Sequence, residues 1–464
     1  MAKPFSFGEI NLDVDPGGRG SGIEREADAP FHMLVVGDFS GRASRGVVET
    51  GSRLSALRPV EVDRDNLDDV MAGMHVELQL PVAGSVRFKE LDDFHPDRLY
   101  RRLPLFDKLK QAYAEILKPA RRPASAPEPP PPPQIADLHL GGLLDQAVEQ
   151  TESRIEQRPA RAKDPFQSWL KGVVAPEQEP APDPRPAELE SLVDSARNAQ
   201  MRALMHFPDF QALEAAWHAV DFLVRRVETD SNLKIFLLDV SKEELADGAP
   251  AGVLLAKYAG GTPWAVIACN YRFGHAVQEL QLLSHLGAAG RAMGASVIAE
   301  AEPSLATDEA GAAWEALRSH SVGAHIGLVL PRFLLRLPYG KDTGACEDIR
   351  FEEMGGEPDH DRYLWANPSF ACLVLLAESF ASRGWDFRPG MHLNLDGLPL
   401  HSYEKDGAHI LQPCAEYLMT EKTANHLLER GLMPLASLKE SDSARLVRFQ
   451  SIAMPAAPLA GRWG

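Results

Sequence analysis

The chain has 464 residues, of which 44% are apolar and 25% are charged, and its formal net charge is -18. This length is enough for two or three domains with a sizeable core, and this balance of apolar and charged residues is typical of a soluble globular protein. The acidic charge argues against a nucleic-acid partner, because binding to a phosphate backbone needs clusters of basic side chains.

No stretch of the sequence indicates export or insertion into a membrane. The first residues, MAKPFSFGEINLDVDPGG, lack the apolar core of a signal peptide, and the apolar stretch FACLVLLAESFA is too short and too polar to span a bilayer. The four cysteines lie far apart and have no paired metal-ligand spacing. We therefore expect a cytoplasmic protein in a reducing compartment, with no structural metal and no cofactor.

The first predicted element is a strand over residues 33–36 that runs into a glycine-bounded turn, in the stretch LVVGDFSGR. A phosphate-binding loop needs two glycines five residues apart, followed by Lys and then Ser or Thr. Here Gly37 and Gly41 are four residues apart and Arg42 follows without such a pair. A dinucleotide fingerprint would need a third glycine. The sequence therefore predicts a structural turn.

Residues 31–118 are predicted to form a first compact unit of strands and helices. In the short helix expected over residues 64–74, Leu67, Val70 and Met71 recur at helical spacing. The other predicted elements are two alternating strands and one helix interrupted by a proline: strands over 75–82 and 85–91, and a helix over 95–117 that contains Pro104.

The composition changes between residues 119 and 185. Two proline-laden stretches, KPARRPASAPEPPPPPQ and APEQEPAPDPRPAE, are typical of semi-rigid linkers. Between them, LHLGGLLDQAVEQTESRIEQR predicts a short amphipathic helix. We therefore expect a first domain over residues 1–118, a proline-rich linker over 119–185 and a second domain over 186–464.

The second domain is predicted to be α/β, because apolar strands alternate with amphipathic helices. Ser241 and Glu244 have the spacing of a capping box at the start of one short helix. The predicted strands are 233–240, 264–269, 295–299 and 325–330, and the predicted helices are 211–227, 275–294, 311–320, 370–383 and 421–430. The fold class is α/β, with mixed sheets flanked by helices and a largely parallel main sheet.

Two stretches resemble sites but lack the spacing that a site needs. Residues 338–344, PYGKDTG, contain Gly-Lys-Asp-Thr without the upstream glycine of a phosphate loop, so we expect an ordinary loop. His95 lies between Asp93 and Asp97, which is compatible with a metal or an acid–base pair, but no His-x-x-x-His spacing supports it. We expect a solvated turn there, and we predict no catalytic residue.

Three motifs, GDFSGR, VDRDN and DDFHPD, follow one another in residues 31–117 in the order found in a known family. This part resembles the small sheath subunit of bacterial type VI secretion systems, the TssB or VipA family. Residues 190–451 resemble the large sheath subunit, the TssC or VipB family. The stretches that carry the second resemblance are HFPDFQALEAAWHAVDFLV, ETDSNLKIFLLDVSKEEL, GLVLPRFLLRLPYG, LWANPSFA and GLPLHSY.

This double resemblance implies a fusion of two subunits that interlock into one protomer. In the family, protomers polymerise into a contractile sheath around an inner tube, and an AAA+ ATPase later disassembles it. The implied function is structural and not enzymatic. The implied partners are other sheath subunits or further copies of the chain, with the inner tube protein, the baseplate and the recycling ATPase as additional partners.

Two departures from the family pattern open alternatives. A covalent linker fixes the ratio of the halves and raises their effective concentration to roughly millimolar. The family's large subunit continues beyond the equivalent of RFQSI, with strands shared between protomers, whereas this sequence ends at AMPAAPLAGRWG. The alternative role is therefore a non-polymerising accessory: a cap, an initiator or an end component. An α/β enzyme is the alternative of another class; a pocket with perturbed titratable groups would favour it, and strands paired between the halves would favour the sheath.

Two stretches are candidates for contacts with partners. The helix between the proline-rich stretches lies where the resemblance places the segment that the ATPase recognises. The alternative is a helix that packs only on its own chain. Its candidate anchors are Leu143, Leu144 and Val148. The N-terminal arm alternates as a strand donated to a neighbour would, through Phe5, Phe7, Ile10, Leu12 and Val14.

Overall fold

The computed structural model describes residues 29–54, 56–81, 83–116, 186–246, 264–307 and 311–463. The N-terminal arm proposed as a donated strand (Phe5 to Val14), the linker and the anchors Leu143, Leu144 and Val148 lie outside these residues. We call residues 29–116 the N-segment and residues 186–463 the C-segment, in each case as far as they are described.

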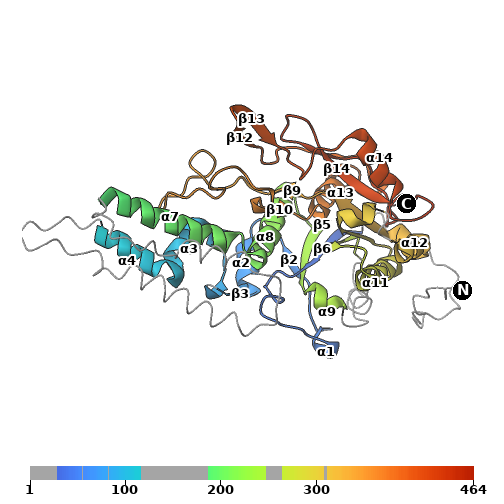
Figure 1. The fold of residues 1–464 in the computed structure, drawn as a ribbon. Helices are drawn as coiled ribbons and strands as arrows, with labels where there is room; N and C mark the ends of the chain where they lie inside the picture. Colours follow the sequence, from blue (N-terminus) through green and yellow to red (C-terminus); the bar gives the residue numbers. More distant parts are fainter. Residues whose placement is uncertain are drawn as a thin grey trace, which may run out of the picture.

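A nine-stranded sheet forms the centre of the described structure (Figure 1). Its strands, in spatial order, are β11 (Asn394–Leu395), β15 (Ala444–Leu446), β14 (Leu432–Ser437), β8 (Ile326–Leu330), β7 (Ser296–Ala301), β6 (Val266–Phe273), β1 (Phe31–Gly37), β5 (Leu233–Asp239) and β2 (Val60–Val62). The pairings from β14 to β5 are parallel, and those of β2, β15 and β11 are antiparallel. The predicted α/β class and the largely parallel sheet are confirmed.

The central residues of β1, 33–36, are all apolar, and both faces of the strand are covered there. Met33 and Val35 join one hydrophobic cluster, and Leu34 and Val36 join a second cluster on the opposite face. Alternation of successive side chains across a strand produces this division. A strand buried on both faces needs a continuous apolar run, which is the pattern found in residues 33–36.

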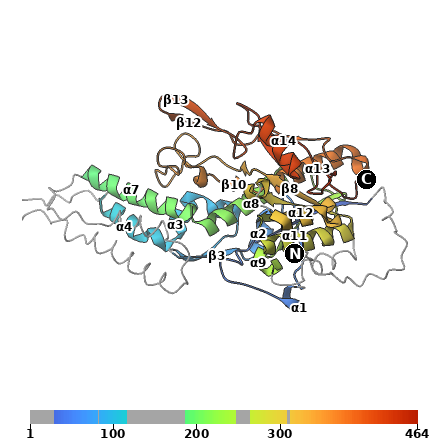
Figure 2. The same cartoon turned by 45° about the vertical axis from the view of Figure 1, so that its right-hand side comes forward.

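Helices cover both faces of the sheet, as Figure 2 shows from a second side. Helices α8 (Pro208–Arg226) and α13 (Ser369–Arg383) supply the cluster that contains Met33. Helices α9 (Lys242–Ala246), α11 (Val277–Met293) and α12 (Gly311–Ser319) supply the cluster that contains Leu34. The fold is therefore a three-layer arrangement of helices, sheet and helices.

The remaining elements of the N-segment pack beside the sheet. They are α1 (Gly51–Leu54), α2 (Leu67–Gly73), the hairpin of β3 (Glu77–Leu80) and β4 (Gly84–Arg87), α3 (Pro96–Arg102) and α4 (Asp107–Ile116). Figures 1 and 2 both show α4 beside α7 (Pro186–Met205), the two extending away from the sheet. Leu109, Ala112 and Val193 form the small core between these two helices.

The C-segment also contributes smaller elements around the sheet. They are the pair β9 (Phe333–Leu334) and β10 (Trp365–Ala366), the hairpin of β12 (His401–Lys405) and β13 (Ala408–Gln412), and helix α14 (Glu421–Glu429). Residues 447–463 contain no strand, and Leu459 and Trp463 are buried against the core.

Local predictions agree well with the observed elements. The predicted helix over 95–117 is broken before Pro104, because α3 ends at Arg102 and a short 3-10 turn precedes α4. The capping box is present: the Ser241 N–H donates to Glu244 Oε2 at 2.8 Å, and the Glu244 N–H donates to Ser241 Oγ at 3.2 Å. No helix in the described residues is long and apolar enough to cross a bilayer.

Candidate functional site: the seam between the two segments

The two segments meet in the middle of the sheet. Strand β1 of the N-segment pairs in parallel with β5 over its full length and with β6 over residues 33–36, and both neighbours belong to the C-segment. Val35, for example, is opposite Leu237 on one side and Ala268 on the other. We call this contact the seam. Removing β1 would leave two strands of the C-segment with unpaired backbone groups, so strong pairing is expected.

The GDFSGR turn, residues 37–42, directly follows β1, and carboxylates bind several of its N–H groups. The N–H groups of Phe39 and Ser40 donate to Asp239 Oδ1 at 2.8 and 2.9 Å. Asp38 accepts two further N–H groups, from residues 42 and 43, at 2.7 and 2.8 Å. Burial raises the pKa of Asp38 and of Asp239, and these hydrogen bonds partly offset that rise. Carboxylates therefore hold the donors that a phosphate loop would offer to its ligand.

Gly41 is required by its conformation and by its surroundings. Its φ is +76°, a region that L-residues with a side chain rarely adopt. A Cβ atom at this position would lie 2.4 Å from the carbonyl oxygen of Glu77, which is shorter than any normal contact. The glycine thus lets the turn approach the β3–β4 hairpin, which confirms the structural interpretation of this turn.

Arg42 connects the turn to the C-segment through a bidentate ion pair. Its Nε and Nη2 donate to the two oxygens of Glu244 at 2.8 and 2.7 Å, and the Glu244 side chain is fully buried. Although burial raises the pKa of Glu244, Arg42 and the Ser241 and Glu49 N–H groups together lower it below its ordinary value. The capping-box glutamate that the sequence predicted thus has a second role, which local spacing does not show.

Trp217 of α8 packs against the same turn. Its indole N–H donates to the carbonyl oxygen of Phe39 at 2.8 Å, and the two rings meet edge to face with centroids 5.9 Å apart. Both side chains are fully buried. The amphipathic helix predicted over residues 211–227 therefore carries a specific contact across the seam.

A second contact across the seam lies at the start of α3. The Asp97 carboxylate accepts the N–H groups of Glu347 and Asp348 at 2.8 and 3.0 Å. Arg101 forms an ion pair with Asp348. The expectation of a solvated turn at this place was wrong for Asp93 and Asp97, which are both buried; the Asp97 carboxylate caps a loop of the C-segment. His95 is partly buried, and its Nδ1 accepts the Asp97 N–H at 3.2 Å.

A buried arginine holds that same loop on α8. Arg336 donates to Glu214 at 2.8 Å and to both oxygens of Glu353 at 2.7 and 3.0 Å. Burial raises the pKa of Glu214 to about 7 despite the pair with Arg336. Glu353 differs: burial raises its pKa, but Arg336, His206 and the Tyr339 N–H outweigh burial and lower it to about 2. The loop of residues 336–353 is thus fixed by charge as well as by packing.

The stretch 338–344 within this loop is an ordinary turn, as expected. Gly340 and Gly344 exchange backbone hydrogen bonds of 3.1 and 3.0 Å, and the Lys341 N–H donates to Glu352 Oε1 at 3.0 Å. The fragment Gly-Lys-Asp-Thr therefore closes on itself.

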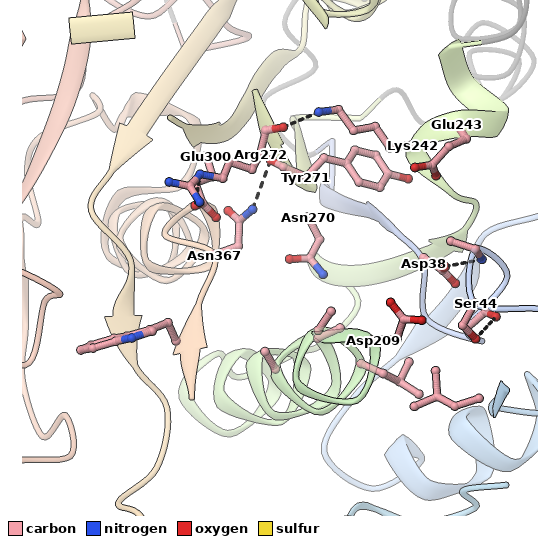
Figure 3. A pocket seen from close by; sticks show the side chains of 18 of the residues that line it. Asp38, Ser44, Asp209, Lys242, Glu243, Asn270, Tyr271, Arg272, Glu300 and Asn367 are labelled. Atoms are coloured by element: carbon pink, nitrogen blue, oxygen red, sulfur yellow. Dashed lines mark hydrogen bonds and ion pairs between the residues drawn. The ribbon is translucent and has the colours of Figure 1, made fainter. Parts of the chain in front are cut away.

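A cavity of about 350 Å³ lies on the seam, at the carboxyl ends of β1, β6 and β7 (Figure 3). Its lining includes Asp38, Ser44, Asp209, Asn270, Arg272 and Glu300. The strand order reverses here, because β5 lies on one side of β1 and β6 on the other. Ligands of open α/β sheets bind at such a switch point, so sequence reasoning missed a position of interest.

The polar groups of this cavity are largely engaged with the protein itself. The Tyr271 hydroxyl donates to the Val240 carbonyl oxygen at 2.6 Å, and the Asn367 amide donates to the Tyr271 carbonyl oxygen at 3.3 Å. Burial raises the pKa of Glu300 to about 7, although Arg272 lies 3.3 Å away. No His or Cys occurs among the described residues of the lining. The hydroxyl of Ser44, another lining residue, donates to the Gly41 carbonyl oxygen at 3.0 Å.

Each of the two segments that share the sheet matches a known protein family. Residues 188–310 and 304–453 match the family described as EvpB/VC_A0108, tail sheath N-terminal domain, and these ranges cover more than half of the chain. Residues 9–119 match the family described as Type VI secretion system, VipA, VC_A0107 or Hcp2. The chain belongs to the type VI secretion tail sheath family. The predicted fusion is confirmed, since VipA-type and VipB-type parts occur in one chain.

A curated relative supports the same assignment. The chain is 32% identical over 308 residues to the "Type VI secretion system sheath protein TssC1" of Pseudomonas aeruginosa. The match covers 58% of this chain and 62% of that protein. The chain therefore spans about three fifths of the relative's length. The seam described above joins the parts that match the two families.

The interlocked sheet leads to a prediction about the linker. If the linker is cut at a protease site placed between residues 129 and 133, the two fragments should stay together, because β1 remains paired on both sides and Arg42 remains bound to Glu244. The test is size-exclusion chromatography at micromolar concentration, with the uncut chain as the reference. Elution as two separate species would contradict the prediction.

Proposed function

We propose that this chain is a structural component of a type VI secretion sheath or of a sheath-like assembly, acting through protein–protein association. The observation that carries the proposal is the position of β1 of the VipA-type part between β5 and β6 of the VipB-type part. Each chain would then supply both a VipA-type and a VipB-type part in the cytoplasm, with other sheath subunits or further copies as its partners.

The finer partners follow from the family and not from a described contact. We propose that the inner tube protein, the baseplate and a recycling AAA+ ATPase contact the assembly. Leu143, Leu144 and Val148 remain candidate anchors for the ATPase. Phe5, Phe7, Ile10, Leu12 and Val14 remain a candidate donated strand. All eight lie outside the described residues, so these assignments stay predictions.

Two observations bear on the enzyme alternative, and they point in different directions. The switch-point cavity with Glu300 is the kind of feature that would favour an enzyme. The strands paired between the segments favour the sheath. We give the second more weight, because in the cavity the side chains of Tyr271 and Asn367 donate to backbone carbonyl oxygens and Arg272 pairs with Glu300. We therefore propose a structural role without catalysis.

Electron microscopy of residues 1–464 tests the proposal. The chain alone is expected not to form long tubes, because the described sheet ends in β2 and β11, strands of three and two residues, which offer few backbone groups for strand addition. Mixed with separately encoded VipA-type and VipB-type subunits, it is expected to enter their assemblies, as an accessory at an end would. Long tubes from the chain alone would establish the full-sheath role. No association in either experiment would contradict the proposed function.

A further inference from the structure

Three potential metal ligands meet at the second contact of the seam. One ligand atom each from His95, Asp97 and Cys346 lies within 4.8 Å of the other two. His95 and Asp97 belong to the N-segment, at the start of α3, and Cys346 belongs to the loop of residues 336–353 in the C-segment. From this geometry we propose that the chain binds one zinc ion here, as a clip between the two segments.

The ligand types favour zinc over calcium and magnesium. Imidazole nitrogen, carboxylate oxygen and thiolate sulfur are the three donors that zinc accepts, in sites with three protein ligands and one water. Calcium and magnesium prefer oxygen ligands alone, so they do not suit a cluster with Cys346 and His95.

The spacing is close to what zinc requires. Bonds of about 2.0–2.3 Å to a tetrahedral zinc place ligand atoms roughly 3.3–3.8 Å apart. His95 Nδ1 and Asp97 Oδ2 already lie 3.7 Å apart. Cys346 has to approach by at most about 1.5 Å, which side-chain rotation can supply because Cys346 and His95 are only partly buried.

The surroundings orient the ligands. The Asp97 carboxylate is held by the N–H groups of Glu347 and Asp348, and such outer hydrogen bonds fix ligating carboxylates in known metal sites. The His95 ring packs edge to face against Tyr339, with centroids 4.9 Å apart. Zinc would displace the weak hydrogen bond of 3.2 Å between the Asp97 N–H and His95 Nδ1, or would bind His95 through Nε2.

Binding has a structural consequence for the seam. Zinc would connect the start of α3 to the loop that Arg336 fixes on α8, so its binding free energy would add to the stability of the folded chain. Loading this site would release the thiol proton of Cys346. The inference is independent of the proposed function, because it concerns contacts within one chain.

Metal titration of the full chain tests the clip. Zinc is added in competition with a chromogenic chelator, and cobalt is added as a spectroscopic probe. We expect one equivalent of zinc per chain, a thiolate-to-cobalt charge-transfer band, and a rise in the unfolding temperature with zinc. Cys346→Ser and His95→Gln should each weaken zinc binding by roughly 10–100-fold or more. Replacing even a residue that only holds a metal ligand in place has an effect of this size.

Cys414→Ser is the matched control, because Cys414 is a thiol of the C-segment outside the cluster. It should keep full zinc affinity and the cobalt band. The unfolding temperature of each variant without metal shows whether it folds. Absence of stoichiometric binding, or equal binding by the wild type and by folded Cys346→Ser and His95→Gln, would overturn the proposal.

Discussion

Replacing Arg336 by methionine is expected to lower the free energy of unfolding by about 3–5 kcal/mol. The guanidinium lies between Glu214 and Glu353, whose side chains are 0% and 2% exposed. Without it, both buried carboxylates would lose their guanidinium partner, Glu353 would keep only His206 and the Tyr339 N–H, and the loop of residues 336–353 would lose its anchor. The measurement is the free energy of unfolding from urea denaturation followed by circular dichroism.

Two further variants separate this cause from a general loss of packing. Arg225→Met removes an ion pair with Asp221 at the surface, where the arginine is 58% exposed, and should cost less than about 1 kcal/mol. Adding Glu214→Leu and Glu353→Leu to Arg336→Met should recover much of the loss, because no buried charge remains. A triple variant as unstable as Arg336→Met would show that the carboxylates are not the cause.

Trp217→Ala is expected to destabilise the chain by about 3–5 kcal/mol, the usual cost of removing a fully buried tryptophan. The substitution would create a new cavity directly beneath the GDFSGR turn, because Trp217 packs on Phe39. Trp217→Phe keeps most of the volume but leaves the Phe39 carbonyl oxygen without its donor, which should cost about 1–3 kcal/mol. Urea denaturation measures both variants.

Trp314 provides the matched control for the lost hydrogen bond. It is fully buried in α12, and its indole N–H has no hydrogen-bond partner within the described part of the chain. Trp314→Phe should therefore cost less than Trp217→Phe. If the two substitutions had equal effects, the bond to Phe39 would contribute nothing measurable.

After cleavage of the linker, Trp217→Ala should also promote dissociation of the fragments.

Local physics made much of the fold predictable. The apolar run within β1, the amphipathic helix α8 and the break before Pro104 each depend on residues close in sequence, so a single sequence contains the necessary pattern. The exclusion of a phosphate loop at the GDFSGR turn also needed only spacing, and the structure adds the reason: Asp38 and Asp239 occupy its N–H groups.

Local sequence patterns could not predict the seam. The apolar run over residues 33–36 predicts a strand, but it does not say which strands lie beside it, because the order of a parallel sheet is set by crossovers and not by neighbouring residues. The same holds for the pair of Arg42 with Glu244, which lie 202 residues apart. His95 was interpreted without Cys346 for the same reason, since only the folded chain brings them together.

By itself, then, the sequence determined the class of fold, many of its strands and helices and the sheath family, because short motifs and residue periodicity carry that information; helix α7 and the hairpin of β12 and β13 were not predicted. Only the tertiary structure decided that the VipA-type strand lies inside the VipB-type sheet, that a cavity opens at the switch point, and that three metal-type ligands meet across the seam. Each of these depends on backbone pairing between residues far apart in the chain, where the free energy comes from burying two segments together and not from either segment alone.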